Sequence, residues 1–331
     1  MRKQRKLIVI SSLLLLAWSL LLPVTSNASE LAFSVEAKLP ENQRGDNTYF
    51  DLNMSPGQKQ ELTILLKNST DKAVSVIAEI NPATTNVNGV VEYGKSNTTL
   101  DETAPEIIQN LVSGEKKVSI PAKGEYQYKL NVVMPEKEFD GILAGGISFK
   151  EEETKKEKET NQGMTIENKF SYALAILLRE NETAIKSNLM LSKVEANQLN
   201  VRNVIISEIQ NPVAKYVNQL KVDAIVTKKG KKEELYKTSK EGLQMAPNTT
   251  MHFPLALNGE KLKAGHYTMH ILATSGEDSW NLEKDFEITA QKAKLLNDQD
   301  VSIVKDNTFL YIIMGLVFLL VLVITIFSLI L

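Results

Sequence analysis

The chain has 331 residues, no cysteine and a formal net charge of −2, with 38 Lys and Arg against 40 Asp and Glu. Four of the basic residues lie at the extreme N-terminus (Arg2, Lys3, Arg5 and Lys6), which leaves 34 Lys and Arg against 40 Asp and Glu in the rest of the chain. This mildly acidic balance argues against a nucleic-acid partner because phosphates demand a basic face. Without cysteine, thiol catalysis and disulfides are excluded, and the fold must depend on hydrophobic cores.

The N-terminal segment has the three parts of a secretory signal. A basic cluster ends at Lys6, an apolar run covers 7–22, and the small residues of Ser26-Asn27-Ala28 follow. This pattern predicts a signal peptide over 1–28, cleaved between Ala28 and Ser29. The alternative is an uncleaved signal anchor, which would export the following residues equally well.

A second charge-free segment covers 309–331. About 20 apolar residues cross a bilayer as a helix, so we expect a single-pass transmembrane helix here, with a buried core helix as the alternative. No basic residue follows Leu331 to fix its orientation, which is therefore predicted from the signal peptide alone. Together with the absence of cysteine, this layout predicts an ectodomain on the extracellular face of a Gram-positive cell membrane.

The region 29–150 shows strand patterns. Apolar residues alternate over 62–66 and 74–80 around the polar turn 68–72, which predicts a hairpin, and Asn88-Gly89 predicts another. A capping-box spacing at 103–106, followed by apolar residues at helical intervals, predicts one helix. Further strands are expected at 118–120, 126–133 and 142–149.

The stretch 151–163 lacks apolar residues and is predicted to be a charged linker between two domains, with a long hairpin loop inside one domain as the alternative. Strands are expected beyond it, followed by a polar stalk at 291–308. Many short strands and almost no helix predict an all-β fold, with two immunoglobulin-like antiparallel β-sandwich domains in series at 29–150 and 164–290. The expected strands of the second domain are 170–178, 189–194, 199–206, 217–227, 251–257, 267–273 and 280–288.

Catalytic and metal chemistry find little support. The histidines are His252, His266 and His270, so a Ser-His-Asp site has few candidate bases. His266 and His270 are four residues apart in an expected strand and project to one side, opposite Tyr267, Met269 and Ile271, which favours surface positions over a zinc site. We therefore predict neither enzyme activity nor a cofactor or metal.

Two other motifs are candidate binding sites. Arg44-Gly45-Asp46 is an integrin-type tripeptide in a loop-like stretch, but so short a match is favoured to be chance. Trp280 lies in phase with Leu282, Phe286 and Ile288, which favours a core position over a carbohydrate platform. No ligand-contacting residue is predicted.

The first domain carries a set of motifs that resembles the N-terminal domain of the WxL-interacting proteins. The second half, with Phe170 to Leu178, Gly265-His266-Tyr267 and Trp280, is similar to the following domain of that family. The motifs of the first domain are Pro40-Glu41-Asn42-Gln43, Tyr49-Phe50-Asp51-Leu52, Pro56-Gly57-Gln58-Lys59-Gln60, Ala83-Thr84-Thr85-Asn86-Val87-Asn88-Gly89 with Tyr93, and Phe139-Asp140-Gly141-Ile142-Leu143-Ala144-Gly145-Gly146-Ile147.

The resemblance implies a non-enzymatic surface scaffold. Its first domain would bind peptidoglycan, its second would bind a WxL-domain protein and host ligands, and its last helix would tether the complex to the membrane. Family members often finish with a basic cytoplasmic tail, from which this sequence departs. The alternatives are a host extracellular-matrix adhesin and, third, a wall-active hydrolase with an unrecognised carboxylate pair.

Overall fold

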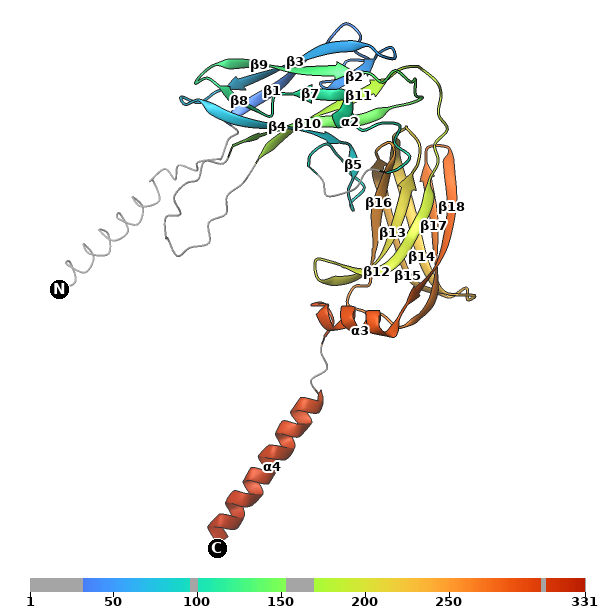
Figure 1. Cartoon of the computed structure of the whole chain (residues 1–331). Coiled ribbons are helices and arrows are strands. Elements are labelled where there is room, and N and C mark those ends of the chain that lie inside the picture. Colours follow the sequence, from blue (N-terminus) through green and yellow to red (C-terminus); the bar gives the residue numbers. More distant parts are fainter. Residues whose placement is uncertain (1–31, 96–100, 153–169, 305–307, 331) are drawn as a thin grey trace, which may run out of the picture.

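The computed structural model describes residues 32–95, 101–152, 170–304 and 308–330 (Figure 1). The predicted signal peptide with Ala28 and Ser29, and all of the predicted linker beyond Glu152, lie outside the described residues. The described chain is mostly β, as expected, and forms two β-sandwiches, each a pair of sheets around its own core. The immunoglobulin-like topology stays a prediction.

The first sandwich consists of one four-stranded and one five-stranded sheet. Their orders are β1-β3-β9-β7 and β2-β11-β10-β4-β8. Inward-facing side chains of both sheets, among them Leu62, Ile64, Val76 and Ile147, make up the core. The strands are β1 (Phe33–Lys38), β2 (Phe50–Asn53), β3 (Lys59–Asn68), β4 (Val74–Pro82), β7 (Val112–Gly114), β8 (Lys117–Ile120), β9 (Glu125–Val133), β10 (Leu143–Glu151) and β11 (Ser171–Arg179).

The predicted hairpin over 62–80 is wrong in its pairing. β3 and β4 form where alternation placed them, but β3 pairs with β1 and β9, whereas β4 pairs with β8 and β10. The polar turn between them therefore carries the chain from one sheet to the other. Alternating apolar residues indicate only that one face of each strand is buried. Two strands that lie in opposite sheets show this pattern as well as two strands of one hairpin do.

The strand expected to open the second domain belongs to the first. β11 pairs antiparallel with β10 over eight residue pairs and parallel with β2 over four. Its Ile176 and Leu178 are fully buried in the first core. The structural boundary therefore follows Arg179, and the charged segment after Glu151 connects two neighbouring strands of one sheet, which is the alternative that the sequence had left open.

The helix predicted after 103–106 is a single turn, α2 (Ile108–Leu111). Its N-cap is Ile107, whose apolar side chain cannot accept a capping hydrogen bond, and the Thr103 hydroxyl donates to Asp101 (2.7 Å) outside the helix. The capping-box prediction is therefore wrong. Ile108 and Leu111 are nevertheless buried, as the apolar spacing required.

The second sandwich pairs a three-stranded sheet, order β12-β13-β16, with a four-stranded sheet, order β15-β14-β17-β18. β15 was not predicted because its side chains are mostly polar and exposed. The core takes residues from both sheets, including Ile205, Val222, Phe253 and Met269. The strands are β12 (Met190–Leu199), β13 (Arg202–Asn211), β14 (Val217–Lys228), β15 (Glu234–Met245), β16 (Thr249–Ala256), β17 (Gly265–Ser275) and β18 (Asp278–Ile288).

The predicted stalk is in large part a docked helix, α3 (Ala290–Gln299), at the end of the second sandwich (Figure 1). Thr289 caps it by accepting a hydrogen bond from the Lys292 N–H (3.2 Å), and Ala293 and Leu296 are buried in the second core. The stalk prediction failed because only these two positions of a short helix are apolar and buried.

The last helix, α4 (Thr308–Ile330), occupies the charge-free segment near the C-terminus. Its side chains are described from Ile312 to Ile324 and are exposed. Among the described residues, no helix reaches the length and apolar character needed to cross a membrane.

Candidate functional site at the junction of the two sandwiches

A short hairpin of the first sandwich reaches the second one. It is formed by β5 (Thr84–Thr85) and β6 (Val91–Glu92), as Asn88-Gly89 predicted (Figure 1). Gly89 adopts a φ of 70°, which favours glycine. Its carbonyl accepts a hydrogen bond from the Gln244 N–H (2.7 Å), and a Cβ added to it would lie 2.8 Å from the Leu243 side chain. Glycine therefore permits both the turn and the close approach to β15.

Behind this hairpin, two buried threonines join the sandwiches. The Thr85 and Thr249 hydroxyls lie 2.8 Å apart, and Thr85 Oγ1 also accepts from the Ala246 N–H (3.0 Å). Thr249 Oγ1 in turn donates to the Ala246 carbonyl (2.8 Å). Since buried hydroxyls must be paired, this arrangement fixes β5 against the turn between β15 and β16.

Asp101 holds the two sandwiches together by its carboxylate. It accepts from Gln210 Nε2 on both oxygens (2.9 and 2.7 Å) and from the Thr250 hydroxyl (3.1 Å), both in the second sandwich. Burial raises the pKa of this carboxyl, but hydrogen bonds from Thr103, Gln210 and Thr250 outweigh it, and the pKa is lowered. The carboxylate is therefore the form that the junction favours.

The loop before β10, which begins the 139–147 motif, also contacts the second sandwich. Glu180 Oε2 accepts from the Phe139 N–H (2.8 Å), and Asn181 Nδ2 donates to Asp140 Oδ1 (2.9 Å), which ties the loop to the chain after β11. The loop ends at Gly141, where φ is 88° and an added Cβ would clash with the Ala214 carbonyl oxygen. The Ala214 carbonyl accepts a hydrogen bond from the Ile142 N–H (2.7 Å).

Glu180 is the most unusual carboxyl of this region, and sequence reasoning did not find it. It is only 9% exposed, and its Oε1 has no hydrogen-bond partner among the described residues. Burial and then the nearby Glu138 raise its pKa. The preceding residue, Arg179, forms a bidentate ion pair with Asp51 of β2 (3.0 and 2.9 Å).

A tyrosine pair closes the junction on another side. The Tyr93 and Tyr216 hydroxyls lie 3.1 Å apart. Burial raises the pKa of both phenols, so they stay protonated at neutral pH and the pair is a neutral hydrogen bond. Tyr93 comes from the segment after β6 and Tyr216 from the loop before β14, so this contact also joins the two sandwiches.

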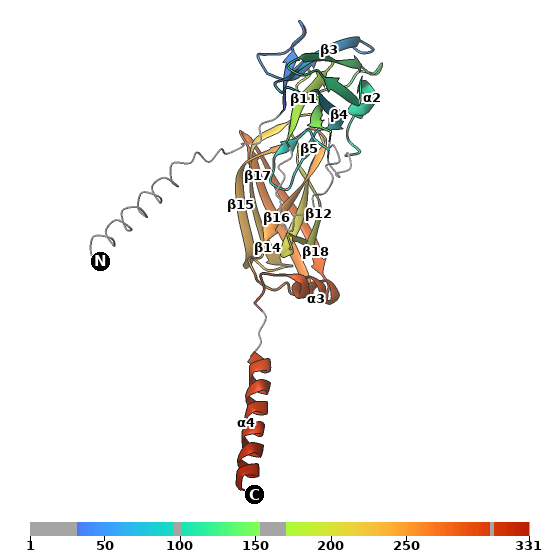
Figure 2. The ribbon, with the colours of Figure 1, turned by 90° about the vertical axis from the view of Figure 1, so that its left-hand side faces the viewer.

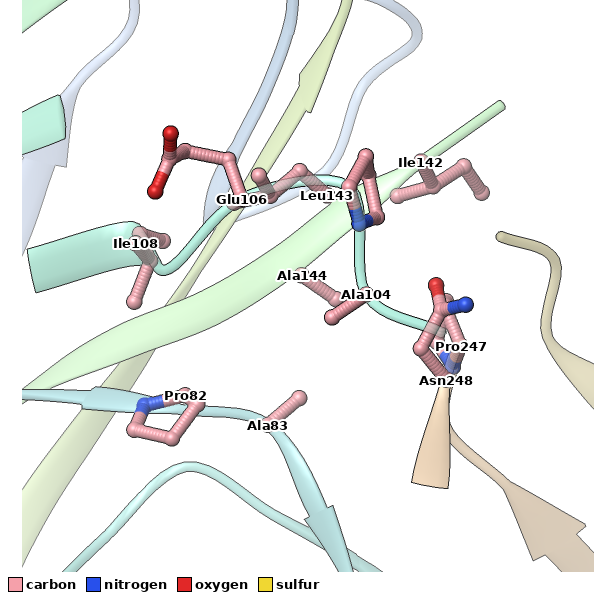
Figure 3. A pocket seen from close by; sticks show the side chains of 11 residues that line it. Pro82, Ala83, Ala104, Glu106, Ile108, Ile142, Leu143, Ala144, Pro247 and Asn248 are labelled. Carbon is pink, nitrogen blue, oxygen red and sulfur yellow. The ribbon is translucent and has the colours of Figure 1, made fainter. Parts of the chain in front are cut away.

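A small cavity lies between residues of the first sandwich, such as Ala83 and Leu143, and Pro247 and Asn248 of the second (Figure 3). It leaves about 20 Å³ for the centre of a water molecule, which is room for one water and not for a sugar or peptide. The hydrogen bond from the Ile107 N–H, followed by that from Asn110, lowers the pKa of Glu106 at its edge. The lining residues are Pro82, Ala83, Ala104, Pro105, Glu106, Ile108, Ile142, Leu143, Ala144, Pro247 and Asn248.

The structure separates most of the residues that the sequence singled out. Arg44-Gly45-Asp46 lies in the first sandwich, where Arg44 pairs with Glu182. His266 and His270 lie opposite the buried Tyr267, Met269 and Ile271 of β17, as predicted. His270 bonds to Thr227 and lies 3.2 Å from Glu283, and no three His, Asp or Glu side chains of the described chain are grouped so as to hold a metal ion.

Trp280 and Leu282 pack against the second core, as their phase with Phe286 and Ile288 predicted. The sequence offered two signals for the junction, the Asn88-Gly89 turn and the Gly141 loop. It offered no signal that these segments would meet residues of β13, β15 and β16.

Several solved structures are distantly similar to the chain. The similar structures include the PapD-like domain of human CEP192 (12% identity, 50% of this chain and 95% of that chain, TM-score 0.29) and the E. coli chaperone DraB (16%, 78% and 97%, 0.28). A family 123 glycoside hydrolase from Clostridium perfringens also matches (11%, 46% and 28%, 0.27). TM-scores this low carry no argument about this chain. No curated protein matches it.

Two family models match the chain, one after the other. Residues 33–151 match the peptidoglycan binding domain of the WxL Interacting Protein, and residues 161–298 match its host binding domain. The second match includes β11, which the structure places in the first sandwich, so the sequence boundary and the structural boundary differ. Both descriptions name binding domains, in the order expected from the motifs. The chain therefore belongs to the WxL Interacting Protein family.

Proposed function

We propose that this protein is a non-enzymatic scaffold of the bacterial surface. Its first sandwich binds peptidoglycan, and its second sandwich binds a WxL-domain protein and retains it at the cell. The observation that carries the proposal is the order of the two family matches along a chain whose two sandwiches are joined end to end. With peptidoglycan bound to the first sandwich and a WxL-domain protein bound to the second, the WxL partner would be held at a fixed distance from the wall.

The arrangement in space supports this assignment. The first sandwich lies at one end of the second, and α3, followed by α4, lies at the opposite end (Figures 1 and 2). If 309–331 anchors the chain in the membrane of a Gram-positive cell after cleavage at Ala28, the peptidoglycan-binding sandwich is the part farthest from the bilayer. The exposed side chains of α4, such as Leu316 and Phe318 at 62% and 69%, suit a lipid environment.

The junction gives the scaffold its stiffness. Contacts through Thr85, Gly89, Asp101 and Gly141 fix the two sandwiches relative to each other instead of leaving a free linker. Two modest binding modules on one rigid body gain effective concentration, because the second binding event becomes intramolecular when the geometry fits. We therefore propose that retention at the surface depends on the junction as well as on either binding surface.

A host-matrix adhesin is the second candidate, favoured by the host-binding description of the second family model. In that case the second sandwich binds an extracellular protein without a WxL partner. No observation favours the hydrolase alternative, since Glu106 is the only carboxyl among the residues that line the described cavity.

The test uses residues 29–304, which keep both sandwiches, their junction and α3. We expect this protein to sediment with purified peptidoglycan and to retain a WxL-domain protein in a pull-down. Binding of immobilised matrix protein with no WxL capture would favour the adhesin, and failure of both wall and WxL binding would refute the scaffold. Release of soluble sugar from the wall would show enzymatic activity instead.

A further inference from the structure

The end of the second sandwich that faces away from the first has an unusual surface. We call it the foot and define it by residues 200–202, 228–234, 257–264 and 289–304. Val301 N–H donates to the Val201 carbonyl (3.1 Å), and the Leu262 N–H donates to Asn297 Oδ1 (2.9 Å). The Lys229 N–H donates to the His266 carbonyl (3.0 Å), which places the β14–β15 turn next to the start of β17. The four segments therefore lie at one end of the second sandwich, the end that carries α3 (Figure 1).

The foot exposes apolar side chains. Val201, Leu295, Val301 and Val304 are 51%, 52%, 67% and 88% exposed. Single exposed apolar residues are ordinary, but several within one end of a domain indicate an interaction surface. Their placement on the hairpin tip, on α3 and on the chain after it means that the second core does not use them.

Val201 is also strained. The β12–β13 turn has φ values of 50° at Asn200 and 58° at Val201, and the second of these positions ordinarily takes glycine. Positive φ is unfavourable for a β-branched residue, and Val201 is 51% exposed, so burial in the core does little to offset the strain. Because the core does not use the strained Val201 side chain, we expect this side chain to interact with a partner.

Basic side chains outnumber acidic ones on the foot. Lys231 and Lys232 in the β14–β15 turn and Lys261 and Lys263 before β17 are exposed, and in the described structure none of these four pairs with a carboxylate. Lys229 pairs with Asp285 (2.6 Å). The basic residues are Arg202, Lys228, Lys229, Lys231, Lys232, Lys261, Lys263, Lys292 and Lys294, and the acidic ones are Glu233, Glu234, Glu260, Asp298 and Asp300.

The foot lies next to the proposed anchor. Val304 ends the described part of the foot and α4 begins at Thr308, so an extended chain separates them by at most about 14 Å. Phosphate charge at a bilayer surface is felt over about 10 Å at moderate ionic strength. If α4 lies in the membrane, the basic and apolar side chains of the foot are within reach of the lipid headgroups.

We propose that the foot docks on an anionic lipid bilayer, with its apolar side chains at the headgroup boundary and its lysines facing the phosphates. This inference rests on the proposed role of the last segment as a membrane anchor. Docking would hold the two sandwiches upright on the membrane, because the junction already fixes one sandwich on the other.

The experiment uses the full chain in nanodiscs of phosphatidylglycerol or of phosphatidylcholine. Since the chain has no cysteine, Val301→Cys gives a single site for a polarity-sensitive fluorophore, and Leu39→Cys, 43% exposed in the first sandwich, is the matched control. We expect acrylamide to quench the Val301 probe several-fold less in phosphatidylglycerol than in phosphatidylcholine, and the Leu39 probe equally in both.

Two further variants separate the contributions. Lys231→Gln with Lys232→Gln should restore quenching in phosphatidylglycerol, while Lys116→Gln with Lys137→Gln, in the first sandwich, should not. Val201→Gly relieves the positive-φ strain, so it should leave the melting temperature unchanged or higher and yet increase the quenching of the probe.

The failure modes differ. A chain that does not enter nanodiscs overturns the anchor and this inference with it. A chain that enters them but leaves the Val301 probe as accessible as the Leu39 probe overturns docking alone. Protection that appears in phosphatidylcholine only when a soluble poly(glycerol phosphate) is added would assign the foot to a wall polymer and overturn the bilayer as its partner.

Discussion

The placement of β11 makes the sharpest prediction about domain structure. A fragment of residues 29–152 ends one residue after the family match to the first domain, which covers 33–151, whereas 29–183 also contains β11. We expect 29–183 to fold and 29–152 to remain unfolded or only loosely collapsed. β11 lies between β2 and β10, so its loss removes the strand with which β2 pairs over four residues and opens the core.

The size of the effect follows from burial. Ile176 and Leu178 are fully buried in the first core, and fully burying such a side chain is worth about 1.5–3 kcal/mol each. Together they contribute about 3–6 kcal/mol, before the hydrogen bonds to both neighbouring strands are considered. A domain of this size has a net stability of about 5–15 kcal/mol, so the loss is comparable to the whole.

Thermal unfolding followed by circular dichroism measures the difference. A matched point variant, Leu178→Ala in residues 29–304, should lower the free energy of unfolding by about 2–5 kcal/mol without removing a strand. Adding a peptide of residues 168–183 to the short fragment should restore a cooperative transition. If 29–152 melts cooperatively at the temperature of 29–183 without that peptide, the assignment of β11 to the first core is refuted.

The remaining predictions concern the junction, a buried ion pair and the tripeptide. Gly141→Ala should destabilise residues 29–304 more than Gly230→Ala in thermal unfolding, because both have positive φ but only the first meets another atom; equal losses would contradict a tight junction. The lowered pKa of Asp101 means that its contribution is present above about pH 4 and is lost as the pH falls through the folded pKa, so the melting-temperature difference between wild type and Asp101→Asn should shrink on acidification. A difference independent of pH would exclude a charge effect. Asp51→Ala leaves the largely buried Arg179 guanidinium without its carboxylate partner and should cost about 3 kcal/mol in denaturant unfolding; a loss below about 1 kcal/mol would show that water replaces the carboxylate. Asp46→Glu should leave integrin-dependent cell adhesion unchanged. A loss of adhesion in this variant would show that the tripeptide binds an integrin.

The sequence by itself determined the β class and much of the inward-facing set. Tyr267, Met269 and Ile271 are buried while His266 is exposed, because alternation along a strand is a local property that one buried face imposes. The Asn88-Gly89 hairpin was local in the same sense, since Gly89 needs the positive φ that its turn demands. The family motifs likewise lie in continuous stretches of chain.

Only the tertiary structure decided which strands pair and which segments meet. Alternation placed β3, β4 and β11 correctly but does not encode a partner, so β3 and β4 lie in opposite sheets and β11 crosses the expected boundary to fill the first core. The sequence predicts a polar stalk where α3 forms, because only Ala293 and Leu296 of this helix are buried. The junction depends on hydrogen bonds between residues more than 100 positions apart, such as Asp101 and Gln210, whose polar side chains carry no periodic signal before the fold brings them together.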